Sequence, residues 1–341
     1  MKKTLIASAI AAISFSGAVA AQSTISAAEM AAKMDSMPSV YGNIQYAIAN
    51  ESIDNAGSEI DQFDNGSTLG VKHEHLIAPG LTGFFKLELE GINADDKANS
   101  SGIDKLDEAY IGVKSDSFGQ LWVGTDDSTY ERAIVKIANF HEIGTGLDGS
   151  YSTGEGDQIQ YSSPSFGGLT LGASLQVNGD STVGGKSYPY QLAAIYTVDA
   201  LELAFAMDSN DGTLAYSKND VVDPNNENTY GLRATYSMGD LSLTGEYQIR
   251  KDVKNEFGVI GVYALGANQF SLAYQVVEDD TVGLTNGDQE DVIAVQALHN
   301  LSDNMYVYTE AFFYSNDADY DGAVAGSDQK QVAAVGAVYY F

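Results

Sequence analysis

The sequence predicts an all-β protein, a transmembrane antiparallel β-barrel of 16 strands. Segments of about ten residues alternate between apolar and polar side chains, and the joints between them are alternately short and long. Cysteine is absent, whereas Gly (35) and Tyr (21) are abundant. A closed barrel pairs every backbone group inside a bilayer. A barrel of 16 strands is too wide for side chains to fill, so the polar faces are expected to line water.

Residues 1–20 are expected to form a cleaved signal peptide. Lys2 and Lys3 precede an apolar stretch, and small residues at 18–20 provide a cleavage site. Taking these two lysines from the 17 Lys and Arg leaves 15 against 47 Asp and Glu, a net charge of −32. Nucleic acid is therefore excluded as a partner, because phosphates are bound by Lys and Arg. No later stretch has the ~20 apolar residues that a membrane-spanning helix needs.

Residues 21–38 form an N-terminal leader with a short helical pattern. Its apolar side chains recur at helical spacing from Ala28 to Met37, and Pro38 ends the pattern. Two interpretations are open. The leader is either a flexible periplasmic segment or one that enters the lumen and partly blocks it.

Residues 39–341 are predicted to form the barrel domain. In "LTGFFKLELEG", Leu81, Phe85 and Leu87 lie on one face and Lys86 and Glu88 on the other, and similar alternation recurs at 169–177, 201–208, 241–250 and 270–276. Short joints occur at 77–80, 164–168, 199–200, 239–240, 266–268 and 302–304, and long polar joints at 50–66, 178–187, 209–228, 278–290 and 315–328. The segment "QVAAVGAVYYF" (331–341) is expected to be the final strand, paired with the first strand at 40–49 to close the barrel.

Several words of the sequence resemble the Gram-negative general porins, the trimeric 16-stranded diffusion channels of the outer membrane. The matching words are "SVYGNIQYAIA", "STLGVKHEHLIAPGLTGFFKLELE", "DEAYIGVKSDSFGQLWVGTDDSTY", "IQYSSPSFGGLTLGASLQ" and "VAAVGAVYYF", in the family's order over 40–341. The resemblance implies a homotrimer in the outer membrane, in contact with lipid and lipopolysaccharide. It also implies a water-filled channel for passive diffusion of small hydrophilic solutes and ions, narrowed by a third loop folded into the barrel.

The third loop should lie within 126–156. The word "HEIG" stands where the family carries an acidic constriction residue, so Glu142 matches that residue. Asp148 is a second candidate acid and Glu131 a weaker third. The alternative is that all three are solvated loop acids without a role in the channel.

The wall opposite the loop lacks the arginines that enteric members of the family carry there. The positions where enteric members place arginine fall on Thr68 and Asp107, with a third near Gly154. An acidic loop facing few bases predicts a preference for cations. The candidate wall residues are Lys72, Lys86, Glu88, Glu90, Asp107, Arg233 and Glu246.

The acidic joints at 50–66 and 278–291 have two interpretations. They either bind divalent cations that bridge to lipopolysaccharide phosphates or form a solvated, repulsive surface. Adhesion through the long loops, and a channel selective for one substrate, are alternatives to simple diffusion.

No enzyme, cofactor or metal site is predicted. His73 and His75 share a strand face without a third ligand in reach, and His141 and His299 lie far along the chain. The sequence has neither a nucleophile elbow nor a phosphate-binding glycine loop. Neighbouring carboxylates such as Glu88 and Glu90 fit a solvated wall better than a catalytic pair.

Overall fold

The computed structural model describes residues 37–96, 102–103, 105–144, 146–147, 149–177, 188–211, 227–280, 287–320 and 322–341. The predicted signal peptide (1–20) and residues 21–36 of the leader lie outside this range. In the described part of the chain, no helix is both long and apolar enough to span a membrane. The elements are β1 (Ser39–Ile53), β2 (Gly57–Asp64), β3 (Thr68–Ala78), β4 (Leu81–Glu90), β5 (Lys105–Ser115), β6 (Gly119–Thr125), α3 (Thr129–Ala133), β7 (Gln158–Ser162), β8 (Leu169–Gln176), β9 (Tyr190–Val198), β10 (Leu201–Asp208), β11 (Thr229–Met238), β12 (Leu241–Arg250), β13 (Lys254–Leu265), β14 (Asn268–Asp279), β15 (Gln289–Ser302), β16 (Met305–Asn316) and β17 (Gln329–Tyr340).

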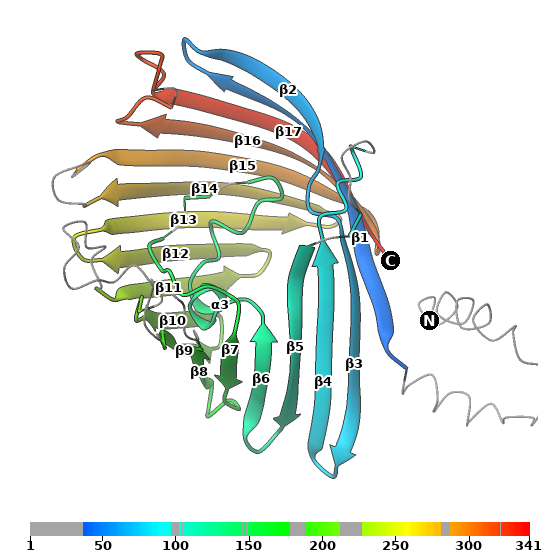
Figure 1. Cartoon of the computed structure of the whole chain (residues 1–341). Helices are drawn as coiled ribbons and strands as arrows, with labels where there is room; N and C mark the ends of the chain where they lie inside the picture. The colour runs from blue at the N-terminus through cyan, green and yellow to red at the C-terminus, as the bar shows by residue number, and fades with distance from the viewer. Residues whose placement is uncertain are drawn as a thin grey trace, which may run out of the picture.

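The strands form one antiparallel sheet that closes on itself (Figure 1). The labels β2 and β3 belong to one interrupted strand, because β1 pairs with β2 along its second half and with β3 along its first. The barrel therefore has 16 strands, as predicted. The seam joins β1 to β17, and Gly42 and Phe341 exchange backbone hydrogen bonds of 3.2 and 3.0 Å there. The C-terminal strand β17 pairs with β16 along one edge, and its other edge pairs with β1, so the barrel has no free edge there.

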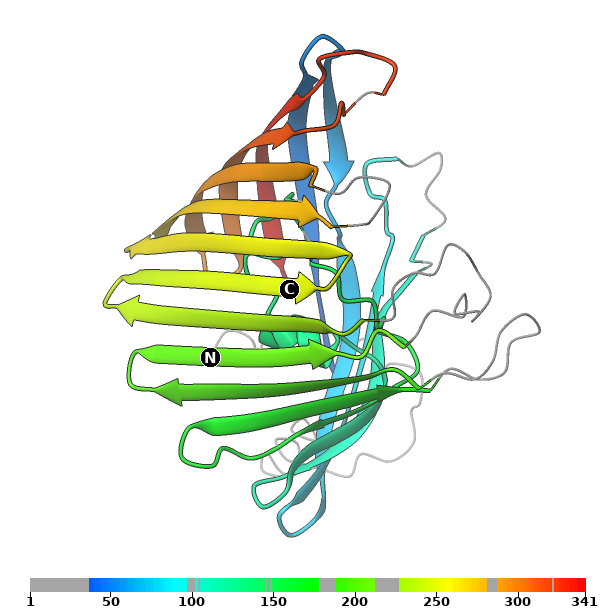
Figure 2. The same ribbon diagram turned by 90° about the vertical axis from the view of Figure 1, so that its left-hand side faces the viewer.

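The predicted long joint at 50–66 is mostly strand. The β1–β2 hairpin extends the sheet, and Ile53 of β1 still pairs with Lys330 of β17 (Figures 1 and 2). Its side chains are largely exposed on both faces, so no alternation of polarity marks this stretch as strand. Backbone pairing forms the hairpin instead.

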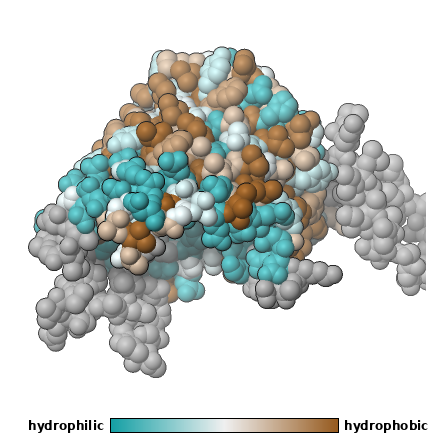
Figure 3. Space-filling view, turned by 90° about the horizontal axis from the view of Figure 1, so that it is seen from above, coloured by the Kyte–Doolittle hydropathy of each residue, from teal (hydrophilic) through white to brown (hydrophobic). Residues whose placement is uncertain are grey.

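Apolar side chains face outward along the strands. Leu203 and Phe205 are each 43% exposed, whereas their neighbours Ala204 and Ala206 face inward and are 4% and 0% exposed. Figure 3 shows apolar residues spread over the outer face, with hydrophilic residues gathered along one margin. Lipid tails can cover such a face without the cost of exposing it to water.

The chain between β6 and β7, residues 126–156, folds into the barrel as predicted and is called the constriction loop below (Figure 1). Ser128 caps α3, its Oγ accepting the Glu131 backbone N–H at 3.2 Å. Tyr130 and Ile134 pack on the alanines of β9 and β10, and Ile137 packs on the apolar inner side of β13 to β16. The loop therefore lies along the inner wall from β8 to β16 and leaves β3 to β5 facing the lumen.

Candidate functional site

Wall carboxylates hold the backbone of the constriction loop. On each of three wall strands, one acid accepts hydrogen bonds from two successive loop N–H groups, and these acids are called the carboxylate clamps below. The pairs are Glu246 with Lys136 (2.8 Å) and Ile137 (3.1 Å), Glu310 with Glu142 (2.7 Å) and Ile143 (3.0 Å), and Asp208 with Ser152 (3.1 Å) and Thr153 (2.9 Å). All three acids are at most 2% exposed. A buried carboxylate needs such donors, so loop and wall depend on each other.

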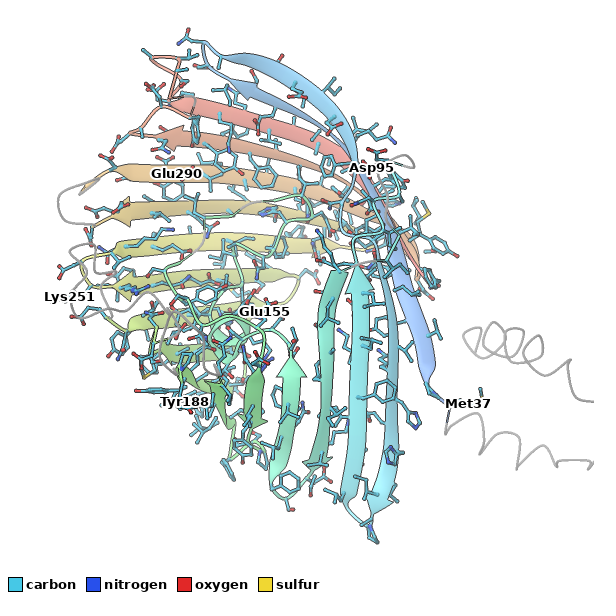
Figure 4. All side chains as sticks on the ribbon, in the orientation of Figure 1. Met37, Asp95, Glu155, Tyr188, Lys251 and Glu290 are labelled. Atoms are coloured by element: carbon cyan, nitrogen blue, oxygen red, sulfur yellow. The ribbon has the colours of Figure 1, made fainter. Side chains whose placement is uncertain are left out.

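Acidic side chains gather where the two ends of the constriction loop meet. Carboxylate oxygens of Asp127, Glu131 and Glu155 lie within 4.8 Å of one another, and these residues are called the acidic group below. Glu155 lies inside the barrel outline (Figure 4). Burial raises the pKa of Glu155, and the neighbouring charges of Glu131 and Asp127 raise it further.

The wall strands facing the loop carry paired charges. Lys86 on β4 forms ion pairs with Glu108 on β5 and with Glu88, the latter at 3.5 Å. Lys72 on β3 places its ammonium 4.8 Å from the centre of the Tyr41 ring. Asp107 is the extra residue of a β-bulge, because the β4–β5 register shifts beside it.

A closed barrel with a loop folded inward is also the architecture of the known proteins to which this chain is similar. Residues 7–339 match the family model described as Gram-negative porin. The chain belongs to the Gram-negative porin family. It is 33% identical over 96% of its length to a protein named monosaccharide porin from a Halomonas species and, by the same figures, to the major outer membrane protein of Halomonas elongata, with 99% of each relative covered.

Solved porin structures share the fold. An anion-selective porin from Comamonas acidovorans has a TM-score of 0.67 at 18% identity, over 89% of this chain and 99% of that one. A trimer form of OmpT from Vibrio cholerae has a TM-score of 0.61 at 15% identity, with the same coverage. Such low identities show the fold alone. The family places this porin in the outer membrane, and its members are channels, not enzymes.

Two predicted wall residues of the porin lie beneath the constriction loop. Arg233 and Glu246 point inward, as the alternation predicted, but they are only 6% and 2% exposed. The Arg233 Nε donates to the Ala133 carbonyl at 2.8 Å, and its Nη2 pairs with Glu202 at 2.7 Å. Both residues hold the constriction loop and do not face open water. The alternation along a strand predicts on which side of the sheet a residue lies, but it does not predict whether a loop covers that side.

The predicted loop acids lie in different places. The Glu142 carboxylate accepts the Tyr306 hydroxyl at 2.9 Å, and its carbonyl accepts Asn65 Nδ2 at 2.8 Å, so this residue is attached to the wall. Burial raises its pKa, which the Tyr306 hydrogen bond partly offsets. Glu131 belongs to the acidic group and accepts Asn139 Nδ2 at 3.0 Å. Asp148 lies outside the described residues, and Glu90 ends β4 at the edge of the bulge.

Asp127, Glu155 and Glu108 were not predicted from the sequence. A usable signal existed for the first two. Gly124 on β6 pairs with Gln158 on β7, so acids just after one strand and just before the next must lie close together. Glu108 falls on the inward register beside the bulge, directly opposite Glu88.

Proposed function

We propose that this porin forms a water-filled, cation-preferring channel for passive diffusion of small hydrophilic solutes and ions. The observation that carries the proposal is the acidic group at the root of the constriction loop. A solute that passes between the loop and β3 to β5 meets these carboxylates in a narrow space, where their field is focused.

In the described part of the chain, two bases near the acidic group form ion pairs with acids that do not belong to it. Arg132 pairs with Asp126 at 2.9 Å, and Lys86 pairs with Glu108 and Glu88, so both cations are matched by other acids. Lys136 and Lys72 are exposed, but each adds one positive charge, whereas the acidic group has three carboxylates. One carboxylate ~5 Å from a monovalent cation attracts it by about 1 kcal/mol in bulk water and about 3 kcal/mol at an effective dielectric constant of ~20. Because about 1.4 kcal/mol is tenfold in occupancy, even partial screening leaves a clear preference.

The solutes are proposed to be small hydrophilic molecules up to monosaccharide size. The relative from Halomonas named monosaccharide porin, 33% identical along nearly the whole chain, supports this class. The anion-selective neighbour shares only 18% of its residues, so its fold does not transfer its ion preference. Ion preference is set by the side chains at the constriction.

The porin is further proposed to act as a homotrimer in contact with lipid and lipopolysaccharide. Outward side chains near the seam, such as Ile48 on β1 and Val335 on β17, are 44% and 54% exposed in the single chain. Neighbouring subunits or lipid tails would cover them. The trimer form of the Vibrio cholerae neighbour supports this assembly.

Reversal potentials in planar bilayers test the ion preference. In a tenfold KCl gradient the wild-type channel should give the potential of a cation-preferring pore, with conductance steps in threes. Replacing the acidic group (Asp127→Asn, Glu131→Gln, Glu155→Gln) should move the reversal potential toward zero. The matched control removes three exposed acids from short turns (Asp199→Asn, Asp240→Asn, Asp303→Asn) and should leave it unchanged. Anion preference in the wild type would refute the proposal.

A further inference from the structure

A hollow of about 350 Å³ lies between α3 and the inner wall of β5 to β9 and is called the alcove below. Small residues create its floor. A Cβ added at Gly172 would stand 3.1 Å from the Thr129 methyl group and 3.5 Å from the Ala193 Cβ, so no larger side chain fits there without movement. The space persists because α3 is fixed by its own packing on β9 and β10.

On one side of the alcove, the charges of Asp126 and Arg132 are paired and their side chains are held in place by hydrogen bonds. Asp126 Oδ2 accepts the Trp122 indole N–H at 2.7 Å and the Arg132 Nη1 at 2.9 Å. The Arg132 guanidinium lies 5.0 Å from the centre of the Trp122 ring and also donates to Gln160. Asp126 and Arg132 cancel each other's charge, so the alcove presents no net charge although the acidic group lies close by.

The other side offers uncommitted polar groups. Tyr110, Gln120, Ser162 and Thr170 line the alcove, and each carries a hydroxyl or an amide group. None of their side chains has a hydrogen-bond partner within the described part of the chain. Gln120 and Ser162 stand directly opposite each other on β6 and β7. Each of these groups both donates and accepts hydrogen bonds, as does every hydroxyl of a sugar.

These features select one ligand chemistry. An apolar solute would leave the four groups unpaired, and an ion would find no opposite charge to match it. The volume is near the lower end of the ~300–1,000 Å³ of small-molecule sites, which suits one sugar ring and not a chain of them.

We propose that the alcove is a binding site for a single neutral polyol of monosaccharide size on the diffusion path. This inference rests on the proposed function and adds to it a solute class and a place. The residues that would contact the polyol are Tyr110, Gln120, Ser162 and Thr170, with the Trp122 ring beside them.

Fluorescence tests the proposal directly, because Trp122 is the only tryptophan of the chain. Purified porin in detergent is titrated with D-glucose, sucrose and sodium gluconate, with calorimetry as a second readout. Glucose should give a saturable change, whereas sucrose and gluconate should bind at least tenfold more weakly. Thr170→Val keeps the shape but removes one hydroxyl and should weaken glucose binding about 2–10-fold, the loss of one neutral hydrogen bond.

The control is Thr244→Val, which removes a half-buried, inward-facing hydroxyl on β12 that contacts the Thr235 hydroxyl at 2.9 Å, away from the alcove, and it should bind glucose like the wild type. A linear response that is equal for all three solutes, or equal glucose binding by both variants, would overturn the proposal. Bilayer conductance is measured on the same protein. If the protein conducts but shows no saturable glucose binding, the sugar site is refuted and the proposed channel stands. If glucose binds saturably but the protein does not conduct, the proposed channel is refuted and the sugar site stands.

Discussion

The carboxylate clamp at Glu310 offers a quantitative test of how the constriction loop is held. Glu310 is 2% exposed and accepts the N–H groups of Glu142 and Ile143 and the Gln296 amide at 2.8 Å. In Glu310→Gln, one oxygen can still accept, but the new NH₂ group faces the Ile143 N–H. One buried donor loses its acceptor, which costs about 1–3 kcal/mol, and the remaining bonds lose the strength of a charged acceptor. The loop should therefore be held about 3 kcal/mol more weakly, roughly 100-fold in the ratio of attached to detached states.

Hydrogen exchange measures this change where it occurs. In Glu310→Gln the amides of 142 and 143 should exchange about 100-fold faster, since local opening sets their protection. Channel noise and the exclusion limit for graded sugars should rise with it. Glu74→Gln is the matched control, because Glu74 is 59% exposed and its ion pair with Lys114 contributes ~1 kcal/mol at most. Unchanged protection at 142–143 in the Glu310 variant would refute the clamp argument.

Two further predictions concern His141 in the constriction loop and the packing of β16 against β17. Burial lowers the pKa of His141 to about 4, below the ~6.5 of an unfolded histidine, so its neutral form stabilises the docked loop above pH ~6.5. This difference in stability, about 3 kcal/mol, is lost as the pH falls from ~6.5 toward 4. Loop exchange should rise more over this window in the wild type than in His141→Gln, in which Glu142 still titrates. An equal pH dependence of the two proteins would contradict the assignment. In Gly336→Val the new Cβ would meet the Tyr308 ring at 2.2 Å, so this variant should unfold at a lower temperature than the wild type when heated samples are run on gels. In the control, Gly245→Val, the new Cβ has only a backbone oxygen at 3.9 Å, so this variant should unfold at nearly the wild-type temperature. Equal unfolding temperatures of the two variants would count against close packing between β16 and β17.

The strand alternation placed the candidate wall residues on the inner side of the barrel, and their roles in the channel stay predictions. Lys72, Lys86 and Glu88 lie on neighbouring strands facing the loop, where alternation alone placed them. Arg233 and Glu246 were placed on the correct side, but the loop covers them. Asp148 and most of the leader lie outside the described residues, so their roles stay predictions.

The sequence by itself determined the class of this protein. The alternation of side chains along each strand separates lipid-facing from inward-facing residues. This alternation is a local property of each segment and does not depend on which strands it pairs with. Only the tertiary structure decided which inward side chains meet water. Glu246 fastens a loop, Asp127 and Glu155 come together, and Asp126 is neutralised by Arg132, because strand pairing and loop docking join segments that are distant along the chain. Such contacts depend on long-range packing, which no local pattern encodes.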